Sequence, residues 1–402
     1  MRFDFTDILF AFSYGLDCVE QEAVGVSKHH SKRVAYMVSR LAKRLQMDRT
    51  QRIELAGCAL LHDNALSEYF REEFSEKGKN LYELHCAKGE RNMSMVPFQT
   101  NIKGIILYHH EHADGTGTFH KKASETPLGA QLIHLADIVD VKFNLKEFPS
   151  KKWAQIKAYL RENRDKKFSG NCIELFLDEF NQEKIEKLTE EHLSESLQEE
   201  FPENMQDYKE SQVKGIAGMF AQIIDYKSES TNYHSMGVAE KAEKMARYYG
   251  YEEEKVLKCY FAGALHDIGK LIVDSDILEK PDKLTEKEYS DIQNHAQGTY
   301  DILNQISGME DIRDWASLHH EKLNGTGYPF GKTGEELGEE ERLMACIDIY
   351  QALTELRPYK KGLSHQETMN IMKSMVRDGL IDGRIVSDLD HVFHLEQAGG
   401  VA

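Results

Sequence analysis

Prolines, closely spaced cysteine pairs and long apolar runs are scarce or absent in this 402-residue chain. Each of these features excludes some classes of protein. Only seven prolines occur, so long helices can run uninterrupted. The six cysteines are scattered and form no CxxC pair, which favours reduced buried thiols over disulfides or a zinc–cysteine site. No apolar run approaches the roughly 20 residues of a membrane span, and the N-terminus lacks the basic region of a signal peptide. We therefore expect a cytoplasmic protein with no membrane partner.

Basic residues are also few compared with acidic ones. The chain has 50 Lys and Arg against 68 Asp and Glu, a formal net charge of −18. This balance argues against binding to a DNA or RNA polymer, which needs clustered cations along the phosphate backbone. It leaves room for a small phosphorylated ligand held by metals and a few local cations. The 41% hydrophobic and 29% charged composition indicates a soluble globular protein, and the length indicates two or three domains.

Apolar residues recur at helical spacing along most of the chain. Val34, Val38, Leu41 and Leu45 follow one another at steps of 4, 3 and 4, the period of a buried helix face. The same spacing recurs after His234 and stops at a glycine, where a helix would end. Thr285 and Glu288 form a sequence typical of a helix-opening capping box. We see no convincing set of alternating strands, so the predicted fold class is all-α.

The two halves of the chain repeat one another. Matching residues are first 204 positions apart, and further along the chain they are 210 and then 211 positions apart. His30-Ser31 matches His234-Ser235, and His62-Asp63 matches His266-Asp267. The matching pairs further along are His85 with His295, His109-His110-Glu111 with His319-His320-Glu321, and Asp137 with Asp348. Each repeat spans about 170 residues, a reasonable domain size. We predict a first domain over residues 1–182 and a second over residues 223–402.

Residues 183–222, between these domains, are polar and strongly charged. We interpret them as a charged helical connector. A solvated surface helix without a function of its own is the expected form.

The second repeat gathers the residue types that bind divalent transition metals. A single His-Asp pair would mean little, because a buried histidine bonded to a neighbour is common. Seven such residues in the same order in both repeats favour a metal centre, and mixed imidazole and carboxylate ligands suit Fe, Mn or Zn. Lys270, three positions after Asp267 and four after His266, is expected on the same helix face, where it could meet a phosphate. The candidate ligands of this repeat are His234, His266, Asp267, His295, His319, His320 and Asp348.

The second repeat also resembles a known family. The run from His266 to Lys270, followed by the run from His319 to Pro329, is similar to the signature of the HD-GYP family. That family belongs to the HD superfamily of metal-dependent phosphohydrolases, and its characteristic members hydrolyse cyclic di-GMP. The resemblance covers about residues 225–393. It implies two tandem helical HD bundles, with the complete active site in the second.

The resemblance implies a role for each matching residue. One metal would be held by His234, His266, Asp267 and Asp348. Asp267 would bridge to a second metal held by His295, His319 and His320. Lys270 and Arg357 would contact phosphates, and the loop with Gly325, Gly327, Tyr328 and Pro329 would shape the mouth of the site. Two metals, Fe or Mn by their ligands, would activate a water, so no side-chain nucleophile is required.

Two positions depart from the family pattern. Members with a third metal carry a glutamate where Ser230 stands, so we expect two metals, and whether hydrolysis ends at linear pGpG or continues to GMP stays open. Gln351 stands where an aspartate is usual, and we expect this to matter less. Two alternatives to cyclic di-GMP hydrolysis also stay open: an HD phosphohydrolase acting on a mononucleotide or (p)ppGpp, and a non-catalytic signalling module.

The first repeat keeps every candidate ligand but loses the cations. Leu66 replaces Lys270, Thr118-Phe119 replace Tyr328-Pro329, and no Arg-Pro-Tyr follows Asp137, although Lys146 sits nine residues after Asp137, as Arg357 does after Asp348. Three interpretations remain: a regulatory domain that still binds metal, a phosphohydrolase of different specificity, and a scaffold with relic histidines, which fits the retained ligands least. The retained ligands are His30, His62, Asp63, His85, His109, His110 and Asp137.

Overall fold

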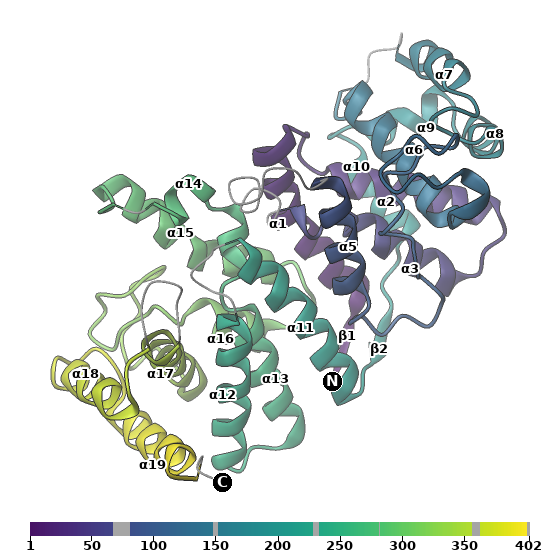
Figure 1. The fold of residues 1–402 in the computed structure, drawn as a ribbon. Coiled ribbons are helices and arrows are strands. Elements are labelled where there is room, and N and C mark those ends of the chain that lie inside the picture. Colours follow the sequence, from purple (N-terminus) through teal and green to yellow (C-terminus); the bar gives the residue numbers. More distant parts are fainter. Residues whose placement is uncertain (67–80, 148–151, 228–232, 281, 356–361, 400–402) are drawn as a thin grey trace. The chain divides into compact units, whose positions relative to one another are not determined.

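The described residues fold mainly into helices, as the computed structural model in Figure 1 shows. It describes residues 1–402 except 67–80, 148–151, 228–232, 281, 356–361 and 400–402. Within the described residues the strands are β1 (Arg2–Asp4) and β2 (Met205–Asp207), which pair in one two-stranded sheet. The predicted all-α class is confirmed.

The chain divides into two compact units, Asp4–Met205 and Gln206–Ala402 with Met1–Phe3. We call them the N-terminal and C-terminal units. The helices of the N-terminal unit are α1 (Phe5–Val24), α2 (His30–Arg44), α3 (Arg49–Leu60), α5 (Leu81–Met93), η1 (Ala123–Glu125), α6 (Leu128–Phe143), α7 (Lys152–Glu162), α8 (Gly170–Glu179), α9 (Gln182–Glu186) and α10 (Leu193–Glu200). Those of the C-terminal unit are α11 (Glu210–Tyr226), α12 (His234–Tyr248), α13 (Glu253–Leu265), η3 (Ile268–Ile272), α14 (Ser275–Leu278), α15 (Glu286–Leu303), α16 (Glu310–Ser317), α17 (Glu339–Thr354), α18 (His365–Arg377) and α19 (Gly383–Gly399).

The core of the C-terminal unit forms where α12 packs against α13 and α17. Val238, Ala242 and Met245, one helical face of α12, are fully buried, and burial of the larger two, Val238 and Met245, stabilises the fold by about 1.5–3 kcal/mol each. Gly250 adopts a left-handed conformation just after α12, so the predicted helix stop is confirmed. The capping box of Thr285 and Glu288 opens α15 as predicted.

The N-terminal unit packs its core in the same way, with α2 against α3 and α6. Val34, Val38 and Leu41 are fully buried. Leu45 is 37% exposed, because α2 ends at Arg44 and Leu45 is its C-cap. The last residue of the predicted apolar face therefore lies at the edge of the core.

His266, Asp267 and Lys270 do not lie on one face of a single helix, so the predicted shared helix face is wrong. Helix α13 ends at Leu265, and a separate 3₁₀ helix, η3, begins at Ile268. A Cβ on Gly269 would lie 1.9 Å from the carbonyl oxygen of His295, so η3 approaches the backbone of α15 more closely than a side chain permits. In a 3₁₀ turn, the side chains of residues three apart lie directly above one another. Lys270 therefore still lies over Asp267, although the two do not share an α-helix.

The stretch 183–222 is not a solvated surface helix throughout. Its last part is the beginning of α11, which packs against α12 and α13. Val213, Ile216 and Phe220 are fully buried, because they recur on one side of the helix while the charged residues occupy the other. The sequence analysis did not recognise this apolar face, because charged residues are so abundant in the stretch.

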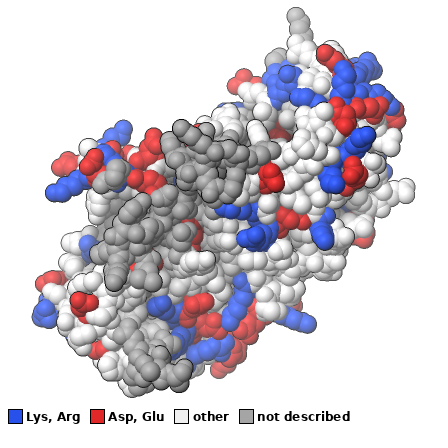
Figure 2. Space-filling view, in the orientation of Figure 1, with Lys and Arg blue, Asp and Glu red and all other residues white. Residues whose placement is uncertain are grey.

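None of the described helices is long and apolar enough to cross a membrane. On the face seen in Figure 2, Lys and Arg alternate with Asp and Glu over the described surface. No broad basic patch is visible on the coloured part of that face.

Candidate metal centres

Asp267 lies at the centre of the candidate ligands of the C-terminal unit, buried just after α13. Its Oδ2 lies 3.2 Å from Nε2 of His266 and 3.9 Å from Nε2 of His234. Its Oδ1 lies 3.5 Å from Nε2 of His295 and 4.0 Å from Nε2 of His319. The two oxygens therefore face two different groups of histidines, which is the arrangement of a carboxylate that bridges two metals.

Three of these histidines are oriented by the backbone of their own turn. Nδ1 lies 2.8 Å from the carbonyl oxygen of Gly263 for His266 and 2.6 Å from that of Ile292 for His295. His319 has the same 2.6 Å contact with the residue three positions before it. With Nδ1 donating, Nε2 keeps its lone pair for a metal. Nε2 of His266 is buried and forms no hydrogen bond with the described groups, as expected of a ligand whose metal supplies the missing interaction.

His234 and Asp348 complete the first group. His234 is the first residue of α12, and its Nε2 lies 3.1 Å from Oδ1 of Asp348 on α17. Burial lowers the pKa of His234, but the carboxylates of Asp348 and Glu355 outweigh burial and raise this pKa to about 10. The candidate ligand atoms of His234, His266 and Asp348 all lie within 4.8 Å of one another.

His320 completes the second group, whose ligand atoms also lie within 4.8 Å of one another. Burial lowers the pKa of His320 to about 3, so this imidazole is neutral and able to coordinate at physiological pH. The ring of Tyr328 lies 4.7 Å from the ring of His320 and 6.2 Å from that of His295. The structure thus places the predicted loop beside the second group.

Backbone approach and one buried carboxylate shape this loop. Glu321, buried, accepts hydrogen bonds from the backbone N–H of Phe330 at 2.7 Å and of Lys332 at 3.0 Å. A Cβ on Gly327 would lie 2.4 Å from the backbone nitrogen of Lys322, so only glycine fits there. Gly325 has a φ of 76°, and Pro329 follows Tyr328 through a cis peptide bond.

Lys270 is the cation of this site. Its Nζ lies 2.6 Å from Oδ2 of Asp267. Burial lowers the pKa of Lys270, but the neighbouring Asp267 carboxylate outweighs burial and raises it, so the side chain stays charged. The same neighbourhood keeps the pKa of Asp267 well below its usual value despite burial. Arg357 and Ser230 lie outside the described residues.

The N-terminal unit brings its candidate ligands together in the same pattern. Oδ1 of Asp63 lies 2.9 Å from Nε2 of His85 and 3.4 Å from Nε2 of His109. Its Oδ2 lies 3.5 Å from Nε2 of His62. The ligand atoms of His30, His62 and Asp137 form one close group, and those of His85, His109 and His110 belong to another. The Nε2 atoms of His62, His85 and His109 are buried without hydrogen bonds among the described residues, so this donor set also fits two metals.

The surroundings of the two candidate centres differ. A cavity of about 520 Å³ borders the N-terminal ligands, and Val26, Leu66 and Ile138 line it together with His134. His134 is buried, and neither ring nitrogen has a hydrogen-bond partner among the described groups. Burial lowers its pKa to about 4, so it is neutral. No Lys or Arg is among the described residues that line this cavity, so the described lining offers no counterpart of Lys270.

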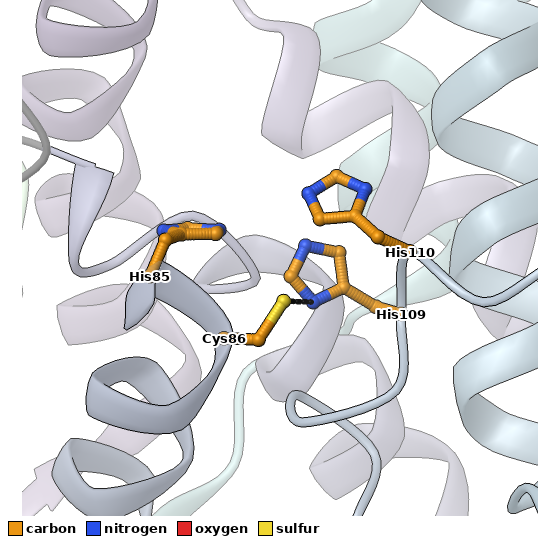
Figure 3. Close-up of side chains that lie close together, drawn as sticks. All are labelled: His85, Cys86, His109 and His110. Atoms are coloured by element: carbon orange, nitrogen blue, oxygen red, sulfur yellow. Dashed lines mark hydrogen bonds between the residues drawn. The ribbon is translucent and has the colours of Figure 1, made fainter. Parts of the chain in front are cut away.

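Cys86 belongs to the N-terminal cluster as well, as Figure 3 shows. Its Sγ lies 3.9 Å from Nδ1 of His109, whereas Nε2 of His109 faces Asp63. Nδ1 also lies 2.6 Å from the carbonyl oxygen of Ile106. The thiol therefore contacts the back of the ring, away from the nitrogen that is available for a metal.

The sequence interpretation missed the carboxylates that orient the first histidine of each unit and the loops beside the ligands. Glu355 contacts Nδ1 of His234 at 2.8 Å, and Asp140 contacts Nδ1 of His30 at 2.6 Å. Glu321 and Glu111 hold the two loops through backbone N–H groups. The Glu321–Glu111 match was visible in the repeat. The other two residues do not align with each other, so the repeat gave no signal for them.

The family model of the HD domain matches residues 17–168 and 218–385, so the chain belongs to the HD domain family. The 3′3′-cGAMP-specific phosphodiesterase 1 of Vibrio cholerae serotype O1 is 31% identical over 381 residues, which cover 90% of this chain and 87% of the relative. A cyclic di-GMP phosphodiesterase of Pseudomonas aeruginosa is 38% identical over 147 residues, 36% of this chain and 35% of that one. Within the HD family the chain is a metal-dependent phosphodiesterase of the HD-GYP type.

A solved structure supports the fold. The crystal structure of a cyclic GMP-AMP specific phosphodiesterase of V. cholerae matches with a TM-score of 0.65 and 20% identity. The match covers 98% of this chain and 99% of the other. At this identity the likeness shows the fold alone.

Proposed function

We propose that the C-terminal unit hydrolyses cyclic di-GMP, or a related cyclic dinucleotide, to the linear dinucleotide with the aid of two divalent metals, Fe or Mn by the donor set. The observation that carries this proposal is the position of Asp267. Its two oxygens face two groups of histidines, and Lys270 lies 2.6 Å from one of them. A carboxylate between two groups of imidazoles and a nearby cation are parts that metal-assisted phosphodiester hydrolysis uses.

The chain's own residues would divide the work as follows. When bound, the metals would supply Lewis-acid activation of a water and of the phosphate. Asp267 would hold the two ligand groups in register, and His295, His319 and His320, whose pKa values burial lowers, would stay neutral. Lys270 would stabilise negative charge that develops on the phosphate. Tyr328, on the loop held by Glu321, borders the second ligand group and would limit which substrates reach it.

The relatives support a cyclic dinucleotide and leave the base composition to experiment. The relative that matches along most of the chain is named as specific for 3′3′-cGAMP. This favours 3′3′-cGAMP as a second candidate substrate beside cyclic di-GMP. A mononucleotide, (p)ppGpp and a non-catalytic role remain the alternatives that the assay must separate.

We further propose that the N-terminal unit is a divergent HD domain with a regulatory role, and that the C-terminal unit, which includes the helix α11 that begins in the stretch 183–222, is the catalytic domain. The N-terminal ligands retain the pattern of a metal pair, but a cavity without Lys or Arg in its described lining gives phosphate no direct cation. A metal that binds there would serve recognition better than hydrolysis.

The test is a product analysis with full-length protein reconstituted with Mn²⁺ or Fe²⁺. Cyclic di-GMP, 3′3′-cGAMP, GMP and ppGpp are supplied separately, and products are separated by chromatography and mass spectrometry. We expect a linear dinucleotide from one or both cyclic substrates, and the later appearance of mononucleotides would show the second step. Hydrolysis of ppGpp alone, or of none of the four by metal-loaded protein, would overturn the proposal.

A further inference from the structure

The first histidine of each repeat is held from behind by a carboxylate, but the two carboxylates come from different positions. In the N-terminal unit, Nδ1 of His30 lies 2.6 Å from Oδ2 of Asp140 on α6. Arg33, fully buried, donates from Nε to Oδ1 of Asp140 at 2.6 Å and from a terminal nitrogen to Oδ2 at 2.9 Å. One cation and one carboxylate thus fix the ring of His30.

The C-terminal unit uses a different set of side chains. Nδ1 of His234 lies 2.8 Å from Oε2 of Glu355. The amide nitrogen of Gln351 donates to the same oxygen at 3.2 Å, and Nζ of Lys241 donates to Oε1 of Gln351 at 2.6 Å. The charges are again one cation and one carboxylate, with a neutral amide between them.

Aligning the repeats shows how the two arrangements are related. The position of Arg33 on α2 corresponds to Gly237 on α12, and Lys241 lies four residues later. The position of Asp140 on α6 corresponds to Gln351 on α17, and Glu355 also lies four residues later. Four residues are about one helical turn, so each charge moves along its helix while staying on the same face.

The glycine in this exchange has a steric reason. A Cβ on Gly237 would lie 2.4 Å from the side-chain nitrogen of Gln351, so the glutamine occupies the space beside α12 that a side chain at position 237 would need. The N-terminal counterparts of Lys241 and Glu355 are Met37 and Asn144, and neither carries a charge. The differences between the repeats at these four pairs of positions therefore form one coordinated change, in which the cation and the carboxylate move together.

We propose that Glu355 is the positioning carboxylate of His234, in the role that Asp140 has for His30, and that the cation–carboxylate pair has moved one helical turn along both helices. A carboxylate behind a histidine fixes the proton on Nδ1, aims Nε2 at the metal and strengthens it as a ligand. The side-chain oxygen of Gln351 accepts from Lys241 and its nitrogen donates to Glu355, so the carboxylate behind His234 is supplied by Glu355. The inference rests on the proposed metal centre and explains how it keeps its first histidine oriented without an aspartate at position 351.

The helix-capping role of position 355 is separate from its side chain. The backbone N–H of Glu355 bonds to the carbonyl oxygen of Gln351 at 2.9 Å and ends α17. A Glu355→Gln substitution keeps this backbone bond and the size of the side chain. It removes only the charge.

The experiment measures Mn²⁺ binding to full-length protein in the absence of substrate. All variants carry Asp63→Asn, so that any remaining N-terminal binding is equal. We expect Glu355→Gln to weaken one Mn²⁺ of the C-terminal pair by about 10–100-fold, the usual cost of losing an outer carboxylate. A rebuilt variant with Glu355→Gln, Gln351→Asp and Gly237→Arg copies the N-terminal arrangement and should recover most of that affinity.

Two outcomes would overturn the inference. One is unchanged Mn²⁺ affinity in Glu355→Gln. The other is weakened binding that the rebuilt variant does not recover although its helicity and thermal unfolding match those of Glu355→Gln, since this would give Glu355 a merely structural role. Because no substrate is present, a protein that binds Mn²⁺ but hydrolyses no cyclic dinucleotide would refute the proposed function and leave this inference intact.

Discussion

The two units place seven matching His and Asp residues in the same pattern and surround them differently. In both, one aspartate faces two groups of histidines. Beside this pattern the C-terminal unit has Lys270 in contact with the aspartate, whereas the N-terminal unit has Leu66 in the wall of a cavity. The comparison teaches that candidate metal ligands and a phosphate-facing cation are separable, because the described N-terminal residues keep the ligand pattern without a lysine at the position of Lys270.

The cavity adds a second difference. His134, neutral and with no hydrogen bond to either ring nitrogen among the described groups, lines it, and the corresponding residue of the C-terminal unit is Ala345. An uncompensated buried imidazole costs stability. The N-terminal unit therefore retains polar groups that its own fold does not satisfy.

The largest expected effect separates the two aspartates. Asp267→Asn should abolish hydrolysis, because an amide cannot bridge two cations, and the loss should exceed the ~10–100-fold that removal of an outer partner costs. Asp63→Asn should leave most hydrolysis intact or change its regulation. Initial rates with the cyclic substrate, measured in full-length protein, make the comparison.

Helicity and metal content of both variants serve as the controls. If only Asp63→Asn lost activity, the active site would lie in the N-terminal unit, and its assignment to the C-terminal unit would be wrong. Loss in both folded variants would show that the units are catalytically coupled, and the regulatory interpretation of the first unit would fail.

Much of this architecture follows from sequence patterns that act locally. The helical period of Val238, Ala242 and Met245 and the capping box at Thr285 were sufficient for the fold class, because both depend on residues within a few turns. The gathering of distant histidines could be expected only through the internal repeat and the family resemblance. Features that arise from tertiary packing could not be predicted, such as the break between α13 and η3 after Leu265 and the hydrogen bond of Glu355.

The next largest effect concerns the cation. Lys270→Ala should lower kcat and kcat/KM together by about 100-fold, the usual cost of losing one preorganised group that stabilises transition-state charge. Metal content should not change, since Lys270 is not a ligand. Steady-state kinetics with elemental analysis measures both quantities.

The result for Lys270 can fail in two informative ways. A rise in KM alone would mean that the lysine binds substrate uniformly. No kinetic change would make it a partner of Asp267 only.

A moderate effect follows from the raised pKa of His234. Its ordinary pKa of 6.5 rises to about 10 in the metal-free fold, so a proton must leave when a metal binds. Apparent Mn²⁺ affinity should therefore increase with pH, by up to about tenfold per unit between pH 6.5 and 10. The stability that this protonated histidine gives the metal-free protein is complete below pH 6.5 and is lost as the pH rises towards 10. Mn²⁺ titrations and thermal unfolding at several pH values test both signs, and an affinity that falls with pH would contradict the assignment.

The smallest effect is expected at Cys86. Its thiol touches the back of His109, and the corresponding residue in the C-terminal unit is Ala296. Cys86→Ala should leave the metal content of the protein and its rate of hydrolysis nearly unchanged. Loss of one metal per chain in this variant would make Cys86 a ligand and the N-terminal centre chemically distinct from the other.

Anomalous diffraction from crystals of the Mn²⁺- or Fe²⁺-loaded protein tests the central claim most directly, because it locates each metal without reference to any substrate. The account predicts two peaks in the C-terminal unit, one among His234, His266 and Asp348 and one among His295, His319 and His320, with a carboxylate oxygen of Asp267 bound to each. A fully loaded crystal with a single ion there, or with ions only in the N-terminal unit, would contradict it.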